Sequence, residues 1–278
     1  MIPAKFEYHR PETVAQATDL LSRLGDDARP LAGGHSLIPM MKLRLASPAH
    51  LVDLQSLKDL RGIRVGAERV ILGAMVDLNE VISNERLAAT MPIFREAAQQ
   101  IADPQVRYCG TVGGNVANGD PGNDLPAVMM CLDACYELAG AGGAVRIVAA
   151  RDFHLGAFET AREDNEILTR ISIPTQPEGT GYAYEKQKRK IGDYATAAAA
   201  VRVGEKKASV AMTNLADKAV WSEAAGAALA ARDVDGCVAA ALAEIDPQED
   251  MRGPIEFKKH VAGVVLRRAI ERALDGAS

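Results

Sequence analysis

The first sixty residues alternate between short apolar runs and a stretch with helical spacing. Residues 5–9, 29–32 and 51–54 are typical of short strands, and the apolar positions within 14–24 fall on one helical face. A second short helix is expected over 37–45. This order predicts a β-α-β-α-β unit. The turn after its second strand lies at a carboxyl end, where open α/β sheets bind ligands.

The hydrophobic pattern changes near residue 62, where alternating positions predict a hairpin. Asp77, with Glu80 three residues later, forms a capping box that begins a helix. The proline of Asp103-Pro104 ends a following helix. The other elements expected in this part are helices at 92–102 and 125–134 and strands at 135–138, 145–148 and 166–173.

Prolines and glycines concentrate within residues 174–181, which predicts a domain boundary there. The alanine run at 195–200 stays open between a helix, which alanine favours, and a buried strand of small residues. Beyond the boundary we also expect strands at 182–188 and 209–213 and helices at 222–231, 234–245 and 254–273.

Two glycine pairs are the main candidates for ligand chemistry. The first glycine loop is Ala32-Gly33-Gly34-His35-Ser36, and the second glycine loop is Thr111-Val112-Gly113-Gly114-Asn115. Glycine adopts positive φ values and lets successive N–H groups point at one anion, so two such loops suit a ligand with two linked phosphates. Neither loop matches a P-loop or the G-x-G-x-x-G fingerprint. Ordinary tight turns remain the alternative interpretation.

Composition narrows the classes of function. The net charge of −5 and the pI of about 5.6 argue against a general nucleic-acid surface. No apolar run approaches the roughly 18 residues of a membrane-spanning helix. Residues 1–5 lack the apolar core of a signal peptide. We therefore expect a soluble protein of the cytoplasm.

The four cysteines are Cys109, Cys131, Cys135 and Cys237, and no two of them form a C-x-x-C pair. Iron–sulfur and zinc sites take several thiolates from closely spaced motifs. We therefore expect packed, incidental thiols and no metal on this chain. Cys109 lies beside the second glycine loop, and a role in tuning a bound ligand stays open for it.

Three long strings carry a family resemblance: AGGHSLIPMMKLRL (32–45), ADPQVRYCGTVGGNVANGDPGNDLPA (102–127) and YAYEKQKRKIGDYATAAAA (182–200). They resemble the FAD-binding medium subunits of the molybdenum hydroxylase, or xanthine dehydrogenase, family. Within that family they are most similar to the branch whose complexes oxidise carbon monoxide. The likeness runs from His9-Arg10-Pro11 to Arg252-Gly253-Pro254 and the last helix.

The resemblance implies an α+β fold with two domains. Residues 1–177 would form an FAD-binding domain of the vanillyl-alcohol-oxidase (PCMH) type, with lobes of about 1–55 and 56–177. Residues 178–278 would combine a three-stranded antiparallel sheet with a helix bundle. The boundary predicted from prolines and glycines agrees with this division.

The resemblance also implies where FAD binds. Both glycine loops would hold the FAD pyrophosphate through backbone N–H groups. Asp124 matches an acidic FAD contact, and capping of the next helix is its other interpretation. Leu168 matches an apolar contact to the flavin or adenine end. Ile101 and Ala102, just before the second glycine loop, are expected to pack near the flavin.

Lys186 matches a lysine that contacts the flavin, where a cation stabilises the negative charge of the reduced ring. Tyr194 resembles an aromatic residue that covers one face of the isoalloxazine. We interpret residues 188–190 as a solvated or partner-facing basic surface. His35 is interpreted as loop structure or a phosphate contact, because no carboxylate or serine partner stands at a useful spacing.

By the same resemblance, the chain is an electron-transfer subunit without catalytic residues of its own. A large subunit would carry a molybdenum-pterin cofactor and a small subunit two [2Fe–2S] clusters, in a heterohexamer built as a dimer of heterotrimers. Electrons would leave this FAD for an external acceptor. Contact of the complex with the inner face of the membrane stays open. So do the substrate, the acceptor, and whether FAD binds before assembly.

Three alternatives to this function remain. A self-contained FAD-dependent reductase or oxidase would turn over a small substrate alone, yet no paired acid–base constellation is visible. A medium subunit of a related N-heterocycle hydroxylase would share the same flavin loops. A non-enzymatic assembly subunit would have lost its nucleotide site, yet both glycine loops are intact.

Overall fold

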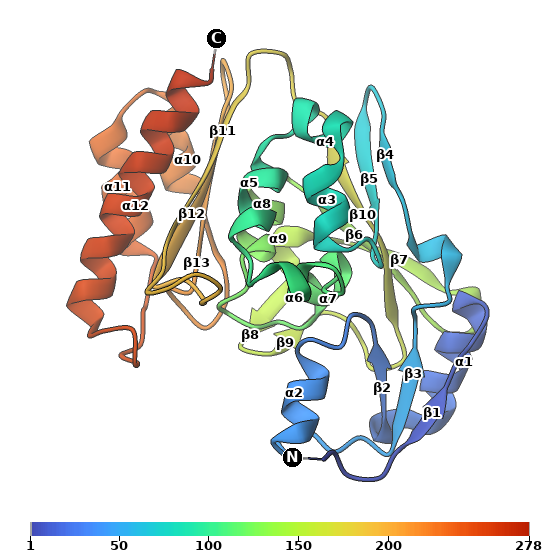
Figure 1. Cartoon of the computed structure of the whole chain (residues 1–278). Helices are drawn as coiled ribbons and strands as arrows, with labels where there is room; N and C mark the ends of the chain where they lie inside the picture. The colour runs from blue at the N-terminus through green and yellow to red at the C-terminus, as the bar shows by residue number, and fades with distance from the viewer. Residues whose placement is uncertain (1, 278) are drawn as a thin grey trace.

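The computed structural model describes residues 2–277, so Met1 and Ser278, at the ends of the two expected domains, lie outside it. The strands of the N-terminal lobe (blue in Figure 1) form a parallel sheet in the order β1-β3-β2. The expected β-α-β-α-β unit is confirmed. Its elements are β1 (Glu7–His9), α1 (Val14–Leu24), β2 (Ala28–Leu31), α2 (Leu37–Lys42) and β3 (His50–Asp53).

Different helices cover the two faces of this sheet. Leu51 of β3 packs with Leu31 and Met41 on the α2 side. Val52, the next residue, packs with Ala17 of α1 on the other side. Successive side chains of a strand point to opposite faces, so one short strand contributes to both packing layers.

The second lobe places a five-stranded antiparallel sheet, ordered β4-β5-β10-β6-β7, against a group of short helices (Figure 1). The strands are β4 (Ile63–Val65), β5 (Arg69–Gly73), β6 (Cys135–Ala139), β7 (Val145–Ala149) and β10 (Ile167–Pro174). The helices are α3 (Leu78–Ser83), α4 (Glu85–Thr90), α5 (Ile93–Gln100), α6 (Pro104–Arg107), α7 (Val112–Ala117), α8 (Leu125–Cys131) and α9 (Ala150–Phe153). A small hairpin joins β8 (His154–Gly156) to β9 (Glu159–Thr160).

The helix starts of this lobe are only partly as expected. Asp77 and Glu80 form the predicted capping box. Pro104 does more than end the preceding helix, because it begins α6, where Asp103 accepts the N–H of Val106 at 3.0 Å. The helices α4, α6 and α7 were not predicted, since one or two turns carry too little hydrophobic periodicity.

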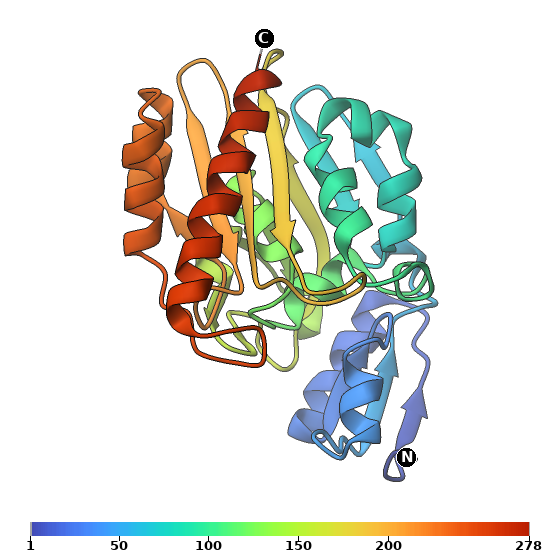
Figure 2. The same ribbon diagram turned by 60° about the vertical axis from the view of Figure 1, so that its left-hand side comes forward.

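The C-terminal part is a four-stranded antiparallel sheet with three helices on one face (Figure 2). The three expected strands are present, and a fourth extends the sheet. This strand, β14, was not predicted, because it has only three residues and its last residue, Ser222, caps the helix α10 that follows directly. The elements are β11 (Gly181–Gln187), β12 (Ala197–Val203), β13 (Ala208–Thr213), β14 (Val220–Ser222), α10 (Glu223–Ala230), α11 (Val234–Ala243) and α12 (Ile255–Asp275).

The alanine run belongs mainly to strand β12. Ala197 and Ala199 pack in the core formed with α10, α11 and α12. Ala198 and Ala200 belong to the core of the second lobe, on the opposite face. A strand buried on both faces has a continuous apolar sequence, which single-sequence periodicity does not distinguish from a buried helix.

Helix α12 is the longest described helix, with 21 residues. It carries several charged residues, among them Glu256, Lys259 and Arg268. Within residues 2–277, no helix combines the length and the apolar character that crossing a bilayer requires.

Candidate functional site

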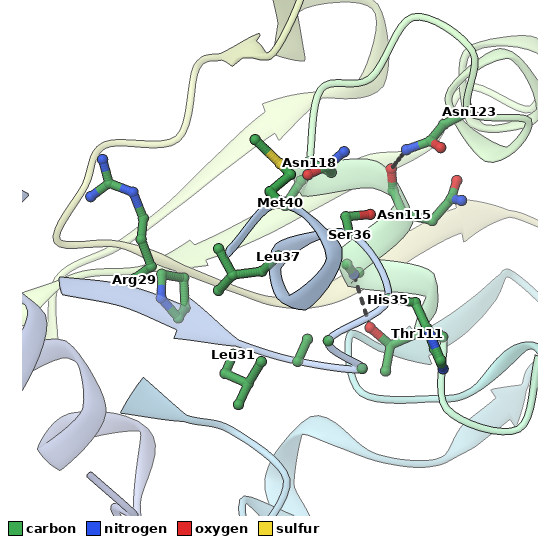
Figure 3. A pocket seen from close by; sticks show the side chains of 18 of the residues that line it. Arg29, Leu31, His35, Ser36, Leu37, Met40, Thr111, Asn115, Asn118 and Asn123 are labelled. Atoms are coloured by element: carbon green, nitrogen blue, oxygen red, sulfur yellow. Dashed lines mark hydrogen bonds between the residues drawn. The ribbon is translucent and has the colours of Figure 1, made fainter. Parts of the chain in front are cut away.

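A cavity of about 810 Å³ lies where the N-terminal lobe, the second lobe and the segment after β11 meet. Volumes of about 300–1,000 Å³ are typical of small-molecule sites. In Figure 3, Ser36 of the first glycine loop lies across from Asn115 of α7. Apart from Val112, all the residues predicted for the cofactor site line this cavity: Ala32, Gly33, Gly34, His35, Ser36, Ile101, Ala102, Thr111, Gly113, Gly114, Asn115, Asp124, Leu168, Lys186 and Tyr194.

The first glycine loop is open toward the cavity. Gly34 has a φ of +74°, which glycine adopts without strain. A Cβ on Gly33 would lie 2.1 Å from the carbonyl oxygen of Cys109, so a larger residue requires the backbone to move. Among the described residues, the backbone N–H groups of 33–36 donate no hydrogen bond. Free N–H donors beside a cavity form the kind of array that binds an anion.

The second glycine loop does not form a second array of this kind. Most of it belongs to helix α7, and Thr111 caps that helix by accepting the N–H of Gly114 at 3.0 Å. The N–H of Gly113 donates to the carbonyl of Ala74 at 2.9 Å, and that of Asn115 donates to the carbonyl of Thr111. The N–H groups expected to face a phosphate are therefore engaged within the chain.

The glycines of this second loop allow close packing instead. A Cβ on Gly113 would lie 2.6 Å from the Cβ of Ala74, and one on Gly114 would lie 3.6 Å from the Cβ of Ala32. Helix α7 can therefore lie directly against β5 and the first glycine loop. Val112 is fully buried, which explains why it does not line the cavity.

Asparagine side chains join α7 to the start of α8. Asn123 Nδ2 donates to the carbonyl of Asn115 at 2.7 Å, and the Leu125 N–H donates to Asn115 Oδ1 at 3.3 Å. Asn118 and Asn123 also line the cavity (Figure 3). The sequence places both within a polar stretch, but nothing in that stretch predicts which amides face a ligand.

Asp124 and Lys186 form an ion pair in the wall of the cavity. Lys186 Nζ lies 2.9 Å from the Asp124 carboxylate, and the two side chains are 1% and 5% exposed. The Tyr184 hydroxyl donates to the same carboxylate. Burial raises the pKa of Asp124, and the positive charge of Lys186 opposes this rise. The Asp124 side chain makes no capping hydrogen bond to α8, so that alternative interpretation is wrong.

The strand register explains how Lys186 reaches Asp124. Tyr184 and Lys186 are two residues apart in β11, so their side chains share one face of the sheet. Their partners on β12 are Ala200 and Ala198, which belong to the core of the second lobe. The sheet therefore directs both polar side chains toward α5 and α8 while small alanines fill the neighbouring positions.

Lys188 was predicted to lie on a solvated or partner-facing basic surface, and the structure shows it only partly exposed, with its ammonium bonded within the chain. Its Nζ donates to the carbonyl of Gln100 at 3.2 Å, and Lys186 Nζ lies 3.3 Å from the same oxygen. Burial and the neighbouring charge of Lys186 lower the pKa of Lys188. Arg189 and Lys190 are exposed, as expected.

Ile101 and Ala102, just after α5, and Leu168 of β10 line the cavity. Ala102 has a positive φ of 46°, which is uncommon outside glycine. Arg107 holds this turn by donating to the carbonyls of Ile101 and Ala102 at 3.0 and 3.3 Å. Leu168 precedes a register shift between β10 and β6, a feature that re-aims side chains.

Tyr194 lies between glycine backbone and an arginine. A Cβ on Gly122 would lie 2.6 Å from the Tyr194 ring, and the Arg252 guanidinium carbon is 5.7 Å from the ring centroid. Burial, together with the nearby charge of Asp120, raises the pKa of Tyr194 to about 12. The ring therefore presents a neutral aromatic surface at the cavity, with 42% of the residue exposed.

Two arginines of the cavity were not predicted. Arg29 and Arg162 both line it. Burial lowers the pKa of Arg162, and Arg29 contributes to this shift, so the two positive charges lie near each other. Arg29 could have been noticed because it precedes the first glycine loop, whereas Arg162 belongs to no motif.

The carbonyl oxygen of Cys109 lies against Gly33 of the first glycine loop, but Cys109 itself does not line the cavity.

Comparison with known proteins decides the family. Residues 4–176 match the model for the FAD binding domain in molybdopterin dehydrogenase, and residues 182–273 match that for the CO dehydrogenase flavoprotein C-terminal domain. The chain belongs to the FAD-binding family of molybdopterin dehydrogenases. The α+β architecture of an FAD-binding domain followed by a flavoprotein C-terminal domain is thereby confirmed.

Members of this family resemble the chain over its whole length. The carbon monoxide dehydrogenase medium chain of Afipia carboxidovorans is 57% identical over 98% of both chains. A solved carbon monoxide dehydrogenase from Oligotropha carboxidovorans superposes with a TM-score of 0.96 at 56% identity and covers 100% of both chains. Quinoline 2-oxidoreductase from Pseudomonas putida 86 superposes with a TM-score of 0.92 at 30% identity, covering 100% of this chain and 99% of that chain.

The residues of the cavity fit FAD. The free N–H groups of residues 33–36 suit a diphosphate, and Arg29 and Arg162 add positive charge. At Gly33 the chain has no space for a Cβ, so the backbone itself forms this part of the cavity wall. Lys186, buried and paired, provides a fixed cation in the same cavity.

Proposed function

We propose that the chain is the electron-transfer subunit of a molybdenum-dependent dehydrogenase complex that oxidises carbon monoxide. Water supplies the oxygen, so the overall reaction is CO + H2O → CO2 with release of two protons and two electrons. The observation that carries the proposal is 57% identity to a carbon monoxide dehydrogenase medium chain over 98% of both chains. The cavity supports it, because its free N–H array, arginines and buried lysine suit a flavin dinucleotide.

FAD, when bound, accepts electrons from one redox partner and passes them to another. The residues of this chain hold and tune it. The free N–H groups of 33–36 bind the diphosphate, and Arg29 and Arg162 balance its charge. Lys186 places positive charge in the cavity, and Asp124 keeps that ammonium in position. Tyr194 covers one face of the isoalloxazine, and Ile101, Ala102 and Leu168 provide apolar contacts.

The chain's own residues do not carry out the oxidation of the substrate in this proposal. A large subunit with the molybdenum-pterin cofactor binds the substrate, and a small subunit with two [2Fe–2S] clusters conducts the electrons to this chain. The assembly is a dimer of heterotrimers in the cytoplasm, with the inner face of the membrane as a place of contact. We also propose that the boundary between the FAD-binding domain and the C-terminal domain lies between residues 177 and 178.

Native purification from the source cell tests this function. We expect the chain to elute with a larger and a smaller polypeptide, together with FAD, iron and molybdenum, and the peak to reduce an artificial dye when supplied with carbon monoxide. A single yellow chain without metals contradicts the proposal and supports a self-contained flavoenzyme.

A second candidate substrate class is an N-heterocycle, because quinoline 2-oxidoreductase shares the fold over the full chain. The same purified complex separates the two candidates. Dye reduction with quinoline and none with carbon monoxide identifies a heterocycle hydroxylase. The flavin cavity is compatible with either result, since the substrate binds on another subunit.

A further inference from the structure

Two histidines and a glutamate meet on one face of the N-terminal sheet. In the parallel register, Glu7 of β1 is paired with His50 of β3, and His9 is paired with Val52. Glu7 and His9 are two residues apart, so both side chains project from the face that also carries His50. Three side chains of types that bind transition metals therefore share one corner of the sheet.

The distances between their ligand atoms are those of a metal site. His9 Nε2 lies 3.1 Å from His50 Nδ1, and Glu7 Oε2 lies 3.4 Å from His50 Nδ1 and 4.0 Å from His9 Nε2. In a tetrahedral zinc site with metal–ligand distances near 2.0–2.1 Å, neighbouring ligand atoms are about 3.3 Å apart. A small movement of the exposed Glu7 side chain completes that triangle.

We propose that Glu7, His9 and His50 bind a divalent transition-metal ion, Zn²⁺, with water at the fourth position. Two imidazoles and one carboxylate are a known ligand set for zinc, and neutral imidazole nitrogens also suit related first-row ions. The side chains of His9 and His50 are 25% and 21% exposed, so an ion can reach them although both imidazoles are mostly buried. A groove lined by His9 and by Gln16, Asp19 and Arg23 of α1 gives water access to this side.

This site is separate from the flavin cavity. None of Glu7, His9 and His50 lines that cavity. Glu7 and His50 begin their strands, whereas the first glycine loop follows the carboxyl end of β2. His9 ends β1 and lies beside Val52, whose side chain packs on the α1 side, so the proposed ion sits on the α1 face of the sheet and outside the flavin cavity.

The position of β1 suggests what the ion does there. This strand has three residues and lies at the edge of the sheet, paired only with β3 among the described strands. Its residues Glu7 and Tyr8 are exposed, so little apolar burial holds it in place. A metal ion held by β1 and β3 together would fix this edge strand, because metal binding is coupled to the folding of the segment that supplies the ligands.

The proposed site differs from the expectation that the chain binds no metal. That expectation considered cysteine spacing alone. His9 and His50 stand 41 residues apart, and only the pairing of β1 with β3 brings them together.

The test uses the flavin-free full chain without a histidine tag, titrated with Zn²⁺ by calorimetry and with Co²⁺ by visible spectroscopy. We expect one Zn²⁺ per chain and the intense absorption of low-coordinate Co²⁺. His9→Ala and His50→Ala should each weaken binding more than about a hundredfold, because loss of an outer-shell partner alone costs up to about a hundredfold. Glu7→Gln should have a smaller effect, since a water molecule can replace the carboxylate. His260→Ala, an exposed histidine on α12, is the matched control and should bind like the natural chain.

A second measurement tests whether a variant loses Zn²⁺ only because it no longer folds. Circular dichroism should show all variants folded, and Zn²⁺ should raise the unfolding temperature of the natural chain and of His260→Ala but not of His50→Ala. Unchanged Zn²⁺ affinity in the His9→Ala/His50→Ala double variant overturns the proposal. So does the lack of Co²⁺ absorption, or of any Zn²⁺ binding, in the natural chain.

Discussion

The two glycine loops have nearly the same sequence pattern and opposite structural roles. The first lies between a strand and a helix and leaves the N–H groups of residues 33–36 free at the cavity. The second begins helix α7, where Thr111 and Ala74 accept the N–H groups of Gly114 and Gly113. Glycine allows close packing against the protein at both loops, at Gly33 against Cys109 and at Gly113 against Ala74, and the loops differ in which backbone N–H groups stay free.

The largest effect is expected at the ion pair of Lys186 with Asp124, the acidic residue in the segment after the second loop. Lys186→Met leaves the buried carboxylate of Asp124 without its cation, and the free energy of unfolding should fall by about 3–5 kcal/mol. Urea unfolding of the flavin-free chain measures this. The double variant Lys186→Met/Asp124→Asn should recover more than half of the loss, because it removes the unpaired charge. A single variant as stable as the natural chain would show that the pair contributes nothing to the fold.

Alanine at one glycine of each loop separates ligand binding from packing. Gly33→Ala should weaken FAD binding at least a hundredfold, which is about 2.7 kcal/mol, because its Cβ displaces the donor array. Gly113→Ala should change FAD affinity less than tenfold and instead cost about 1–3 kcal/mol of stability by overpacking against Ala74. Flavin fluorescence titration and urea unfolding on both variants give the comparison. Equal losses of affinity would mean that both loops bind the phosphates.

A smaller effect is expected at the cap of α7. Thr111→Ala removes the acceptor of the Gly114 N–H, and loss of such a cap costs about 1 kcal/mol. Thr111→Ser keeps the hydroxyl and should restore most of the stability. Thermal unfolding followed by circular dichroism measures both variants. If serine and alanine behave alike, the hydroxyl does not act as a cap.

The smallest effect concerns pH and Tyr194, whose ring rests on Gly122 in the segment after the second loop. Its pKa is raised to about 12 in the folded chain, so the neutral phenol is favoured by folding. That stabilisation is complete below the ordinary pKa of 10.0 and is lost as the pH rises toward 12. Urea unfolding at about pH 9 and about pH 11 should show a steeper decline in the natural chain than in Tyr194→Phe. Parallel declines would place the titration elsewhere.

The sequence predicted most of the fold because most elements are local. The N-terminal β-α-β-α-β unit and the three C-terminal helices carry clear periodicity, and their bounds differ from expectation by a few residues. The strand nature of 197–200 required tertiary information, since both faces of β12 are buried only once the helices of two different parts pack on it. The short helix α7 was hidden for a related reason, because two glycines suggest a loop.

The lining of the candidate site was predictable where it is encoded in one continuous string, as in the first glycine loop. It was not predictable where the role depends on a partner distant in sequence. From the sequence Lys188 is indistinguishable from the exposed cations beside it, yet its ammonium donates a hydrogen bond to the carbonyl of Gln100. The sequence around Arg162 predicts only an ordinary charged residue, yet the fold places Arg162 at the cavity together with Arg29. Such roles arise from the packing of the second lobe against its neighbours.

The position of Lys186 on β11 limits how freely the parts of this chain can be exchanged between relatives. The lysine that neutralises Asp124 belongs to the sheet of the C-terminal part, whereas Asp124 precedes α8 in the second lobe. A fragment ending near residue 177 would keep the first glycine loop and lose the only cation that forms an ion pair with Asp124 in the described structure. Grafting such a fragment onto another protein would therefore transfer an incomplete flavin site, and a functional chimera must carry β11 with it.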